Sequence, residues 1–171
     1  MNDQVTTTSH WLAADWGTSH LRVWVIDVSG KVLERLKADC GMAHISPDQF
    51  ESQFVTLVES FLSDNAPTKV ICCGMAGSQQ GWREALYLQV PCKPPSAEHA
   101  TFVQTADSRL QVHILPGVKQ MSPADVMRGE ETQIKGFLAL NKEFDGIICL
   151  PGTHTKWVHV SAGEMVSFQT F

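Results

Sequence analysis

Ala-Asp-Trp-Gly-Thr-Ser-His-Leu-Arg-Val-Trp-Val-Ile-Asp, residues 14 to 27, is the stretch that decides the fold. Apolar residues lead into Asp15, a turn follows at Gly17, Thr18 and Ser19, and apolar side chains then alternate with others as in a strand. The pattern predicts a tight hairpin with backbone N–H groups and two hydroxyls beside a carboxylate. Such a turn can hold a phosphate and its metal ion, which makes phosphoryl transfer the first hypothesis. An ordinary hairpin with Asp and Gly at its turn is the alternative.

The composition is that of a soluble globular protein. The 171 residues are 43% hydrophobic and 18% charged, with a net charge of -5. This mild acidity argues against nucleic acid or an anionic membrane as the main partner. Residues 1–10 are polar, lack the apolar core of a signal peptide or membrane anchor, and are expected to form a short disordered tail.

The cysteines indicate a reduced protein. There are five of them, an odd number, and three lie inside apolar runs that are typical of strands. We therefore expect free thiols and a cytoplasmic location. No Cys-x-x-Cys pair and no His-x-x-x-His spacing occurs, so a zinc site built by the protein is not expected.

A second informative stretch begins at Thr68. Residues 68–73 form a continuous apolar run that ends in Gly-Met-Ala-Gly-Ser at residues 74–78. This pattern predicts a buried strand that feeds a glycine-rich loop, and open α/β sheets bind ligands at the carboxyl ends of such strands. A plain strand-to-helix turn is the alternative.

Other segments are predicted from their periodicity. A third strand is expected over 31–39, and a helix from Ser46-Pro47 down to residue 62, with apolar residues at helical spacing. Residues 97–106 predict a short helix and residues 111–115 a strand closed by Pro-Gly.

A longer helix is predicted from Ser122 to about Leu140. Its apolar stripe would contain Glu130, and a carboxylate on a buried face needs a partner or a function. Asp125 would lie in the first turn, where the helix dipole favours an ionised carboxylate. A simple capping acid is the alternative interpretation of Asp125.

The last segment repeats the opening in outline. A strand at 147–150, a Pro-Gly-Thr-His-Thr-Lys turn at 151–156 and two further strands follow the same order as residues 11–39. Two such hairpins indicate a duplicated fold in which each half meets one phosphate of a nucleotide. We expect one domain over 11–144 and the first three strands of a second over 145–171. Three strands alone would leave an apolar face open, so the chain is expected to be part of a longer protein.

Four motifs in this order, at residues 14–19, 74–78, 125–133 and 150–157, resemble the 2-dehydro-3-deoxygalactonokinase family. That family belongs to the sugar-kinase, hexokinase and actin superfamily of two-domain ATPases. The resemblance implies an α/β fold of the actin-like (ribonuclease H-like) type, with a mixed sheet, three leading antiparallel strands and flanking helices. It runs from about Trp11 to Phe171, and the chain ends where the family continues into the domain that holds most of the adenosine pocket.

The resemblance also implies a set of ligand contacts, with ATP and Mg2+ as cofactors. Asp15 matches the acid that holds the magnesium ion through water, and the turn after it lies beside the transferring phosphate. The second phosphate motif, which meets the β-phosphate with backbone N–H groups, is matched by Gly152, Thr153 and His154. Lys156 is close enough in sequence to add positive charge.

For the reaction, the resemblance implies that Asp125 is the general base at the start of a helix, followed by a Gly129-Glu130 pair. The base would accept a proton from the 6-hydroxyl of 2-dehydro-3-deoxygalactonate as that oxygen attacks the γ-phosphorus of ATP. A sugar acid carries a carboxylate that suits arginine. The candidate substrate contacts are Arg22, Arg83, Arg128, Glu130, Ser78 and Trp82. An ordinary helix-surface arginine is the alternative for Arg128, and a core side chain is the alternative for Trp16.

Two other classes of function stay open. A kinase for a different sugar or sugar acid could use the same scaffold. A non-catalytic sugar-binding or regulatory module is the other, although no DNA-binding helix pair or basic patch precedes Trp11. The segment by itself is expected to be inactive because the ATP site would be half present. Its unfinished sheet has open edges, which leaves a homodimer open.

Overall fold

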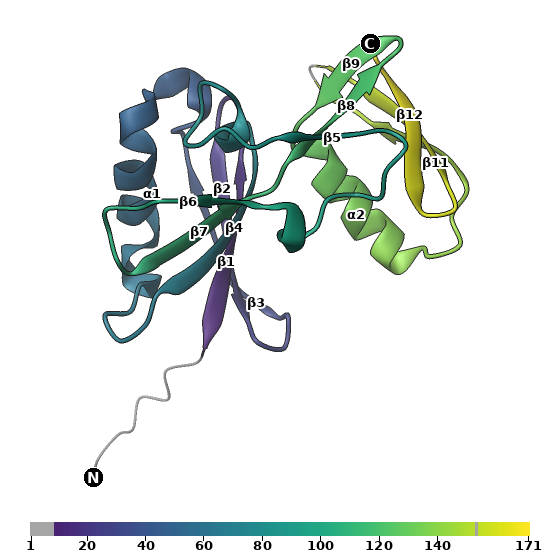
Figure 1. Ribbon diagram of the computed structural model, residues 1–171. Helices are drawn as coiled ribbons and strands as arrows, with labels where there is room; N and C mark the ends of the chain where they lie inside the picture. The colour runs from purple at the N-terminus through teal and green to yellow at the C-terminus, as the bar shows by residue number, and fades with distance from the viewer. Residues whose placement is uncertain (1–8, 153) are drawn as a thin grey trace.

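The structure is a computed structural model that describes residues 9–152 and 154–171. It has two lobes joined by extended segments (Figure 1). The first lobe is a six-stranded sheet in the order β3-β2-β1-β4-β7-β6 together with the helix α1. Its strands are β1 (His10–Trp16), β2 (Leu21–Asp27), β3 (Val32–Ala38), β4 (Thr68–Gly74), β6 (Thr101–Val103) and β7 (Leu110–Ile114). The second lobe contains β5, β8 to β12 and the helix α2.

The first lobe begins with three antiparallel strands, as predicted. β1 pairs with β2 and β2 with β3, and the centre of the sheet then becomes parallel where β1 meets β4 and β4 meets β7. Residues of β2 alternate between buried and more exposed positions, which is why the apolar alternation identified the strand. Parallel pairing brings the carboxyl ends of β1 and β4 to one edge, where Asp15 lies opposite Cys73.

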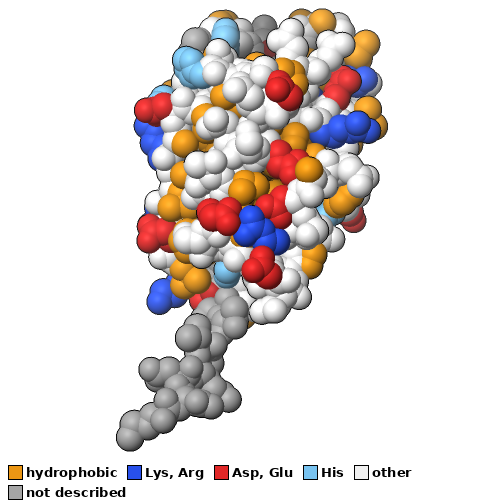
Figure 2. Space-filling view, turned by 90° about the vertical axis from the view of Figure 1, so that its left-hand side faces the viewer, with side chains coloured by type: hydrophobic (Ala, Val, Ile, Leu, Met, Phe, Trp, Pro, Cys, Tyr) orange, Lys and Arg blue, Asp and Glu red, His pale blue; other side chains and the backbone are white. Residues whose placement is uncertain are grey.

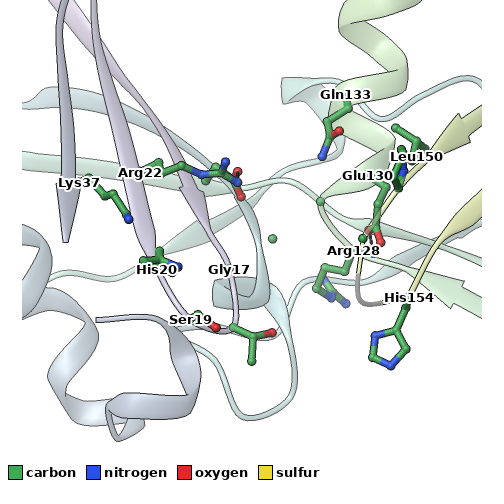
Figure 3. A pocket seen from close by; sticks show the side chains of 16 residues that line it. Gly17, Ser19, His20, Arg22, Lys37, Arg128, Glu130, Gln133, Leu150 and His154 are labelled. Carbon is green, nitrogen blue, oxygen red and sulfur yellow. Dashed lines mark hydrogen bonds and ion pairs between the residues drawn. The ribbon is translucent and has the colours of Figure 1, made fainter. Parts of the chain in front are cut away.

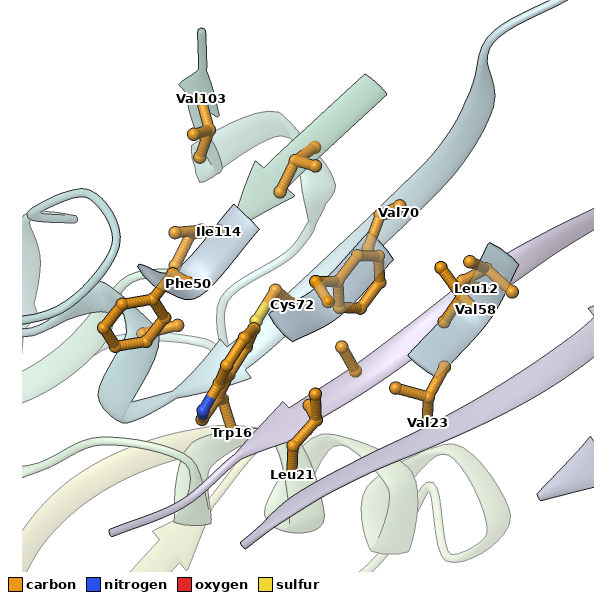
Figure 4. Packing of buried hydrophobic residues seen from close by; sticks show 14 of the residues in the cluster. Leu12, Trp16, Leu21, Val23, Phe50, Val58, Val70, Cys72, Val103 and Ile114 are labelled. Carbon is orange, nitrogen blue, oxygen red and sulfur yellow. The ribbon is translucent and has the colours of Figure 1, made fainter. Parts of the chain in front are cut away.

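One face of this sheet packs on α1 (Phe50–Val58), which follows η1 (Met42–His44) and η2 (Pro47–Gln49) and continues as η3 (Glu59–Phe61). Ser46 and Gln49 form a capping box with Pro47 at the start, so the predicted helix is confirmed. The core between helix and sheet is drawn in Figure 4; among its members are Leu12, Trp16, Val23, Phe50, Val58, Val70, Cys72 and Ile114. Trp16 is fully buried and donates its Nε1–H to the Cys40 carbonyl (2.8 Å), which confirms the core interpretation of that residue.

The second lobe has a core of its own. Its sheets have the orders β10-β11-β12 and β5-β8-β9, and α2 (Glu130–Leu140) packs with them. The strands are β5 (Tyr87–Gln89), β8 (Gly117–Met121), β9 (Ala124–Met127), β10 (Gly146–Leu150), β11 (Lys156–Ser161) and β12 (Glu164–Thr170). Because Ile134 of α2 is buried with Val158 and Val160, one face of β10 to β12 is covered rather than open. Ile147 and Trp157 are half exposed, as is expected for side chains on the other face.

The predicted helix from 122 to 140 is wrong in its first half. Residues 117–127 form the β8–β9 hairpin, with Gln120 opposite Asp125, and α2 begins only at Glu130. Pairing of β8 with the distant β5 supplies backbone partners that the local sequence does not reveal. With this later start, the helical residue on the buried face is Glu131, which is fully buried, whereas Glu130 is only partly buried.

One further expectation is corrected. The segment 97–106 is not a helix: it contains the short η5 (Ala97–His99) and then β6, whose Val103 is buried opposite Val112. The strand predicted at 111–115 is β7, and it ends before Pro116 as expected; Gly117, however, already begins the next strand, β8, which the sequence did not indicate. Strands β6 and β8 are both short, and their state depends on pairing with residues elsewhere in the chain.

The surface has no concentration of one charge on the face that carries α1. Figure 2 shows acidic and basic side chains interspersed with apolar ones there. None of the helices in the described part of the chain combines the length and the apolar character needed to cross a membrane.

Candidate active site

A cleft of about 630 Å³ lies between the two lobes, and both lobes line it (Figure 3). The first lobe contributes the β1–β2 turn and the strands beside it. The second contributes the start of α2 and the loop after β10. In Figure 3, Lys37, Arg22, His20 and Ser19 face Gln133, Glu130, Arg128 and His154 across this space.

The β1–β2 turn is held by a neighbouring segment. The carbonyl oxygens of Gly17, Thr18 and Ser19 accept backbone N–H groups of Met42 (3.1 Å), Ala43 (2.9 Å) and Gly41 (3.2 Å), respectively. These three carbonyls are therefore occupied, which keeps their negative ends away from an anion in the cleft. All three turn residues line the cleft, as a phosphate-binding turn requires.

Asp15 forms an ion pair with Arg22, its register partner on β2. The Asp15 side chain is 24% exposed and that of Arg22 is 55% exposed, so both groups can be reached from the cleft. Gly74 at the end of β4 has φ of +86°, and a Cβ there would lie 2.6 Å from the Trp16 carbonyl oxygen. Only glycine fits at this crossing, which brings β4 close beneath Asp15.

Two more basic groups line the same side of the cleft. His20 lies 3.4 Å from Asp39, and Lys37 lies 3.9 Å from the same carboxylate. Together with Arg22 they make the first-lobe wall rich in nitrogen donors. Such a wall favours anionic ligands such as phosphate or carboxylate groups.

Arg128, which directly precedes α2 of the second lobe, binds Ala85, which belongs to the core of the first lobe. Its Nη2 donates to the Ala85 carbonyl (2.9 Å), its Nε donates to the Tyr87 hydroxyl (3.3 Å), and its guanidinium lies 4.2 Å from the centre of the Tyr87 ring. Nη1 is buried and has no hydrogen-bond partner among the described residues. The alternative of an ordinary helix-surface arginine is therefore wrong, because Arg128 precedes α2 and its side chain is partly buried.

Asp125 lies in a second cavity, of about 460 Å³, that shares residues with the cleft. It is on β9, not at a helix start, and it accepts hydrogen bonds from the Thr170 hydroxyl (2.8 and 2.7 Å) and the Val126 N–H (2.8 Å). Burial alone would raise its pKa. The hydrogen bonds from Thr170 and Val126 and the nearby Lys156 ammonium outweigh burial and hold the pKa of Asp125 below its ordinary value.

Lys156 is nearly buried and belongs to this same group. Its Nζ donates to the Val126 carbonyl (2.6 Å) and to Thr170 Oγ1, and it lies 3.5 Å from Asp125. It lines the second cavity rather than the cleft. The structure thus brings Lys156 to Asp125, a proximity that the sequence did not indicate.

The remaining predicted residues separate into three groups. Gly152 and His154 line the cleft, whereas Thr153 lies outside the described residues. Ser78 lines the second cavity and donates to Met42 Sδ (3.1 Å). Trp82 packs on the rings of the first-lobe core and Arg83 is exposed, and neither lines the cleft or the second cavity.

Sequence reasoning missed several lining residues. They are His20, Lys37, Gln133, Tyr87 and Thr170. His20 directly follows the predicted turn and could have been included on that ground; the others are brought in by distant strand pairing and by α2. Within residues 9–152 and 154–171, no group of three or more His, Cys, Asp or Glu side chains is arranged to hold a metal ion.

These features define an α/β protein of two lobes with a polar, nitrogen-rich cleft between a Gly-Thr-Ser turn and the start of a helix. Residues 15–171 match the family described as 2-keto-3-deoxy-galactonokinase, and the chain belongs to this family.

Similar proteins include one from Rhizobium meliloti (strain 1021) named "Probable 2-dehydro-3-deoxygalactonokinase DgoK1", which is 38% identical over 173 residues and covers 98% of this chain and 55% of its own length. The 2-dehydro-3-deoxygalactonokinase of Escherichia coli (strain K12) is 31% identical over 166 residues, covering 95% of this chain and 53% of its own. The chain thus spans about half the length of these relatives.

Solved structures agree. A crystal structure described as a 2-dehydro-3-deoxygalactonokinase protein from Sinorhizobium meliloti has a TM-score of 0.84 and 37% identity, over 94% of this chain and 53% of that one. A reductive activator for corrinoid, iron-sulfur protein has a TM-score of 0.53 at 16% identity, over 98% of this chain and 31% of that one, and shows likeness of fold alone.

Proposed function

We propose that the protein containing this chain phosphorylates 2-dehydro-3-deoxygalactonate at its 6-hydroxyl with ATP. Family membership supports the substrate class, and one observation of the structure carries the chemistry. The turn at residues 17–19 and the loop containing Gly152 and His154 come from different lobes and line one cleft. Two phosphate-binding segments that face one space fit a nucleoside triphosphate and the sugar acid that accepts its phosphate.

For the fold, we propose the actin-like arrangement, with 11–144 as the first domain and 145–171 as the start of the second. The order of β1 to β3 and the repeated three-stranded sheet β10 to β12 support it. The core of the second lobe also includes Val118, Met127 and Ile134, so part of the first proposed domain packs with the second.

Phosphoryl transfer depends on positioning and charge neutralisation more than on covalent chemistry. Asp15 would hold the magnesium ion. Mg2+ usually keeps several waters and takes one or two carboxylates plus substrate phosphates, so a single accessible carboxylate in a phosphate-binding cleft fits it. The ion, when bound, supplies positive charge to the phosphates. Arg22 and Lys37 add positive charge from the chain itself.

The base has two candidates. Asp125 was predicted at a helix start, but the structure gives that position to Glu130, the first residue of α2. Glu130 lines both the cleft and the second cavity, and its Oε2 accepts the Arg128 N–H (3.0 Å). Both oxygens of Asp125 accept the Thr170 hydroxyl, and Lys156 lies beside them. We therefore favour Glu130 as the proton acceptor and keep Asp125 as the competing proposal.

Of the three arginines proposed to bind the substrate carboxylate, the geometry favours Arg22 as the group that meets ligand anions. Arg83 is exposed outside the cleft. Arg128 lines the cleft, but its guanidinium is engaged by Ala85 and Tyr87, so we propose that it holds the two lobes together there.

The test measures ADP release across a panel of sugar acids. A hybrid chain, in which residues 1–171 are continued by the remaining part of the Rhizobium meliloti relative, should turn over with 2-dehydro-3-deoxygalactonate. Residues 1–171 alone should show no turnover and no tight binding of ATP by calorimetry, because the nucleotide site is divided between the two halves. Turnover only with another sugar acid would support the alternative kinase, and binding without any ATP turnover would support a non-catalytic sugar-binding module.

A further inference from the structure

Glu131 is a buried acidic residue that has no part in the proposed reaction. Its side chain is fully buried, and it is the only acidic residue in the buried set of the described residues. No lysine, arginine or histidine forms an ion pair with it in that part of the chain. Burying an unpaired carboxylate is unfavourable, so the hydrogen bonds that Glu131 accepts are needed to offset part of the cost of its burial.

The Glu131 carboxyl binds the backbone at the start of α2. Both oxygens of Glu131 accept the N–H of Gly129, at 2.9 and 2.7 Å, and the Thr132 hydroxyl lies 3.4 Å from one of them. Gly129 has φ of +112°, a conformation that favours glycine, and it has no side chain with which to cap α2. The carboxylate therefore fixes the turn where β9 ends and α2 begins.

This turn is packed directly on the first lobe. A Cβ on Gly129 would lie 3.4 Å from the Cα of Gly74, and a Cβ on Gly74 would lie 3.4 Å from Asp15 Oδ1. The start of α2, the end of β4 and the end of β1 are thus stacked at the base of the cleft. No side chain separates the two glycines.

Cys73 on β4 lines one cavity together with Asp15, Gly129 and Thr132. Burial raises the pKa of its thiol to about 12, and the carboxylates of Asp15 and Glu131 both contribute to the rise. Gly129, which Glu131 binds, therefore lies at the same strand end as Asp15. The residues on either side of Gly129 are Arg128 and Glu130, and both of them line the cleft.

We infer that Glu131 is a positioning residue of the proposed phosphoryl transfer: by binding the Gly129 N–H it sets where Glu130 stands across the cleft from Asp15. The effect on turnover rests on the proposed function, whereas the hydrogen bond between Glu131 and the Gly129 N–H rests on geometry alone. Misplacing a reacting group by about 1 Å can cost on the order of 100-fold in rate. The carboxylate thus acts on turnover without touching substrate.

The first experiment measures amide hydrogen exchange at Gly129 in residues 1–171 by NMR. Glu131→Ala removes both acceptors and should raise the exchange rate at Gly129 by at least ~10-fold. Glu131→Gln keeps one acceptor oxygen and should give an intermediate rate. The exposed Glu143→Gln, which lies beyond α2, is the matched control and should change nothing there. Unchanged exchange in both Glu131 variants would overturn the inference. If Glu131→Ala fails to fold, the exchange rate of the Gly129 amide in Glu131→Gln alone tests the inference.

The second experiment separates positioning from a structural role. In the hybrid chain, Glu131→Gln should lower kcat by between ~10- and ~100-fold and leave KM for the sugar acid within about threefold. The variant should nevertheless be at least as stable as the parent at neutral pH, because a buried charge is removed. A merely structural residue would lower activity and stability together, so an unchanged kcat, or a loss of activity that follows loss of folding, contradicts positioning. If the unsubstituted hybrid has no activity, the proposed function fails while the exchange measurement still decides the role of the bond.

Discussion

Glu131→Gln should also change how the stability of the chain depends on pH. Burial raises the pKa of the Glu131 carboxyl from 4.5 to about 7, against the opposing effect of the backbone N–H groups of Glu131 and Gly129. The folded state therefore binds this proton more tightly than the unfolded state does. Between pH 4.5 and about 7 the folded chain holds more protons, so the free energy of unfolding falls as the pH rises.

The size of the effect follows from the two pKa values. At ~1.4 kcal/mol for each pH unit, a pKa moved from 4.5 to about 7 corresponds to about 3 kcal/mol. This contribution is fully present below the unfolded pKa and is lost once the pH has passed the folded one. Relative to Glu131→Gln, the parent chain should therefore lose about 3 kcal/mol between pH ~4 and pH ~8.

Urea unfolding followed by tryptophan fluorescence measures this difference, since Trp16 is fully buried in the core. Both chains are unfolded at a series of pH values, with Glu143→Gln as the control for loss of an exposed carboxylate. The difference in free energy of unfolding between the parent and Glu131→Gln should change with pH, and the difference between the parent and Glu143→Gln should stay nearly constant. If the difference in free energy of unfolding between the parent and Glu131→Gln varies by less than ~0.5 kcal/mol between pH ~4 and pH ~8, the raised pKa of Glu131 is refuted.

Three further predictions concern the cleft and the core beside it. In the hybrid chain, Glu130→Gln should lower kcat by ~100- to 10,000-fold and Asp125→Asn by less than ~10-fold, measured by ADP release. Arg22→Ala should weaken binding of the sugar acid or of ATP by at least ~10-fold in calorimetry with the hybrid, because a charge-assisted contact worth ~1.5–3 kcal/mol is lost. Trp82→Ala should destabilise residues 1–171 by about 2–4 kcal/mol in urea and, in the hybrid chain, leave ligand affinity within about threefold, because the ring packs on Trp16 and Phe54 away from the cleft.

Each of these has an outcome that contradicts it. A larger loss in Asp125→Asn than in Glu130→Gln would return the role of base to Asp125. Unchanged affinity for both ligands in Arg22→Ala would remove Arg22 from the anion-binding wall. A Trp82→Ala chain of full stability with weakened substrate binding would restore Trp82 as a substrate contact, as the sequence suggested.

The parts of the fold that could be predicted are those with strong local signals. The β1–β2–β3 meander follows from alternation at every second residue, and α1 follows from its capping box and helical spacing. The parallel strand β4 was identified by a continuous apolar run. All of these elements bury a regular pattern of side chains, and the pattern is written in the chain itself.

The site was predictable only where a motif is contiguous. Asp15, Gly17, Thr18 and Ser19 line the cleft, as do Gly152 and His154. Asp125 and Lys156 were each assigned from their neighbours in sequence, whereas their structural roles depend on Thr170, which lies on a different sheet from Asp125. Trp82 and Arg83 were included because they follow the glycine loop, but chain proximity does not decide which way a side chain points.

What the sequence by itself determined is the family, through its four ordered motifs, and the leading hairpins with the glycines of their turns, through short-range periodicity. The tertiary structure alone decided where α2 begins. Strand β8 pairs with β5 and with β9, and this pairing removes residues 122–127 from the helix that was predicted to begin at Ser122. That shift by a few residues buries Glu131 beneath the cleft and puts Glu130 at its wall, since on a helix a change of one position turns a side chain from one face to another.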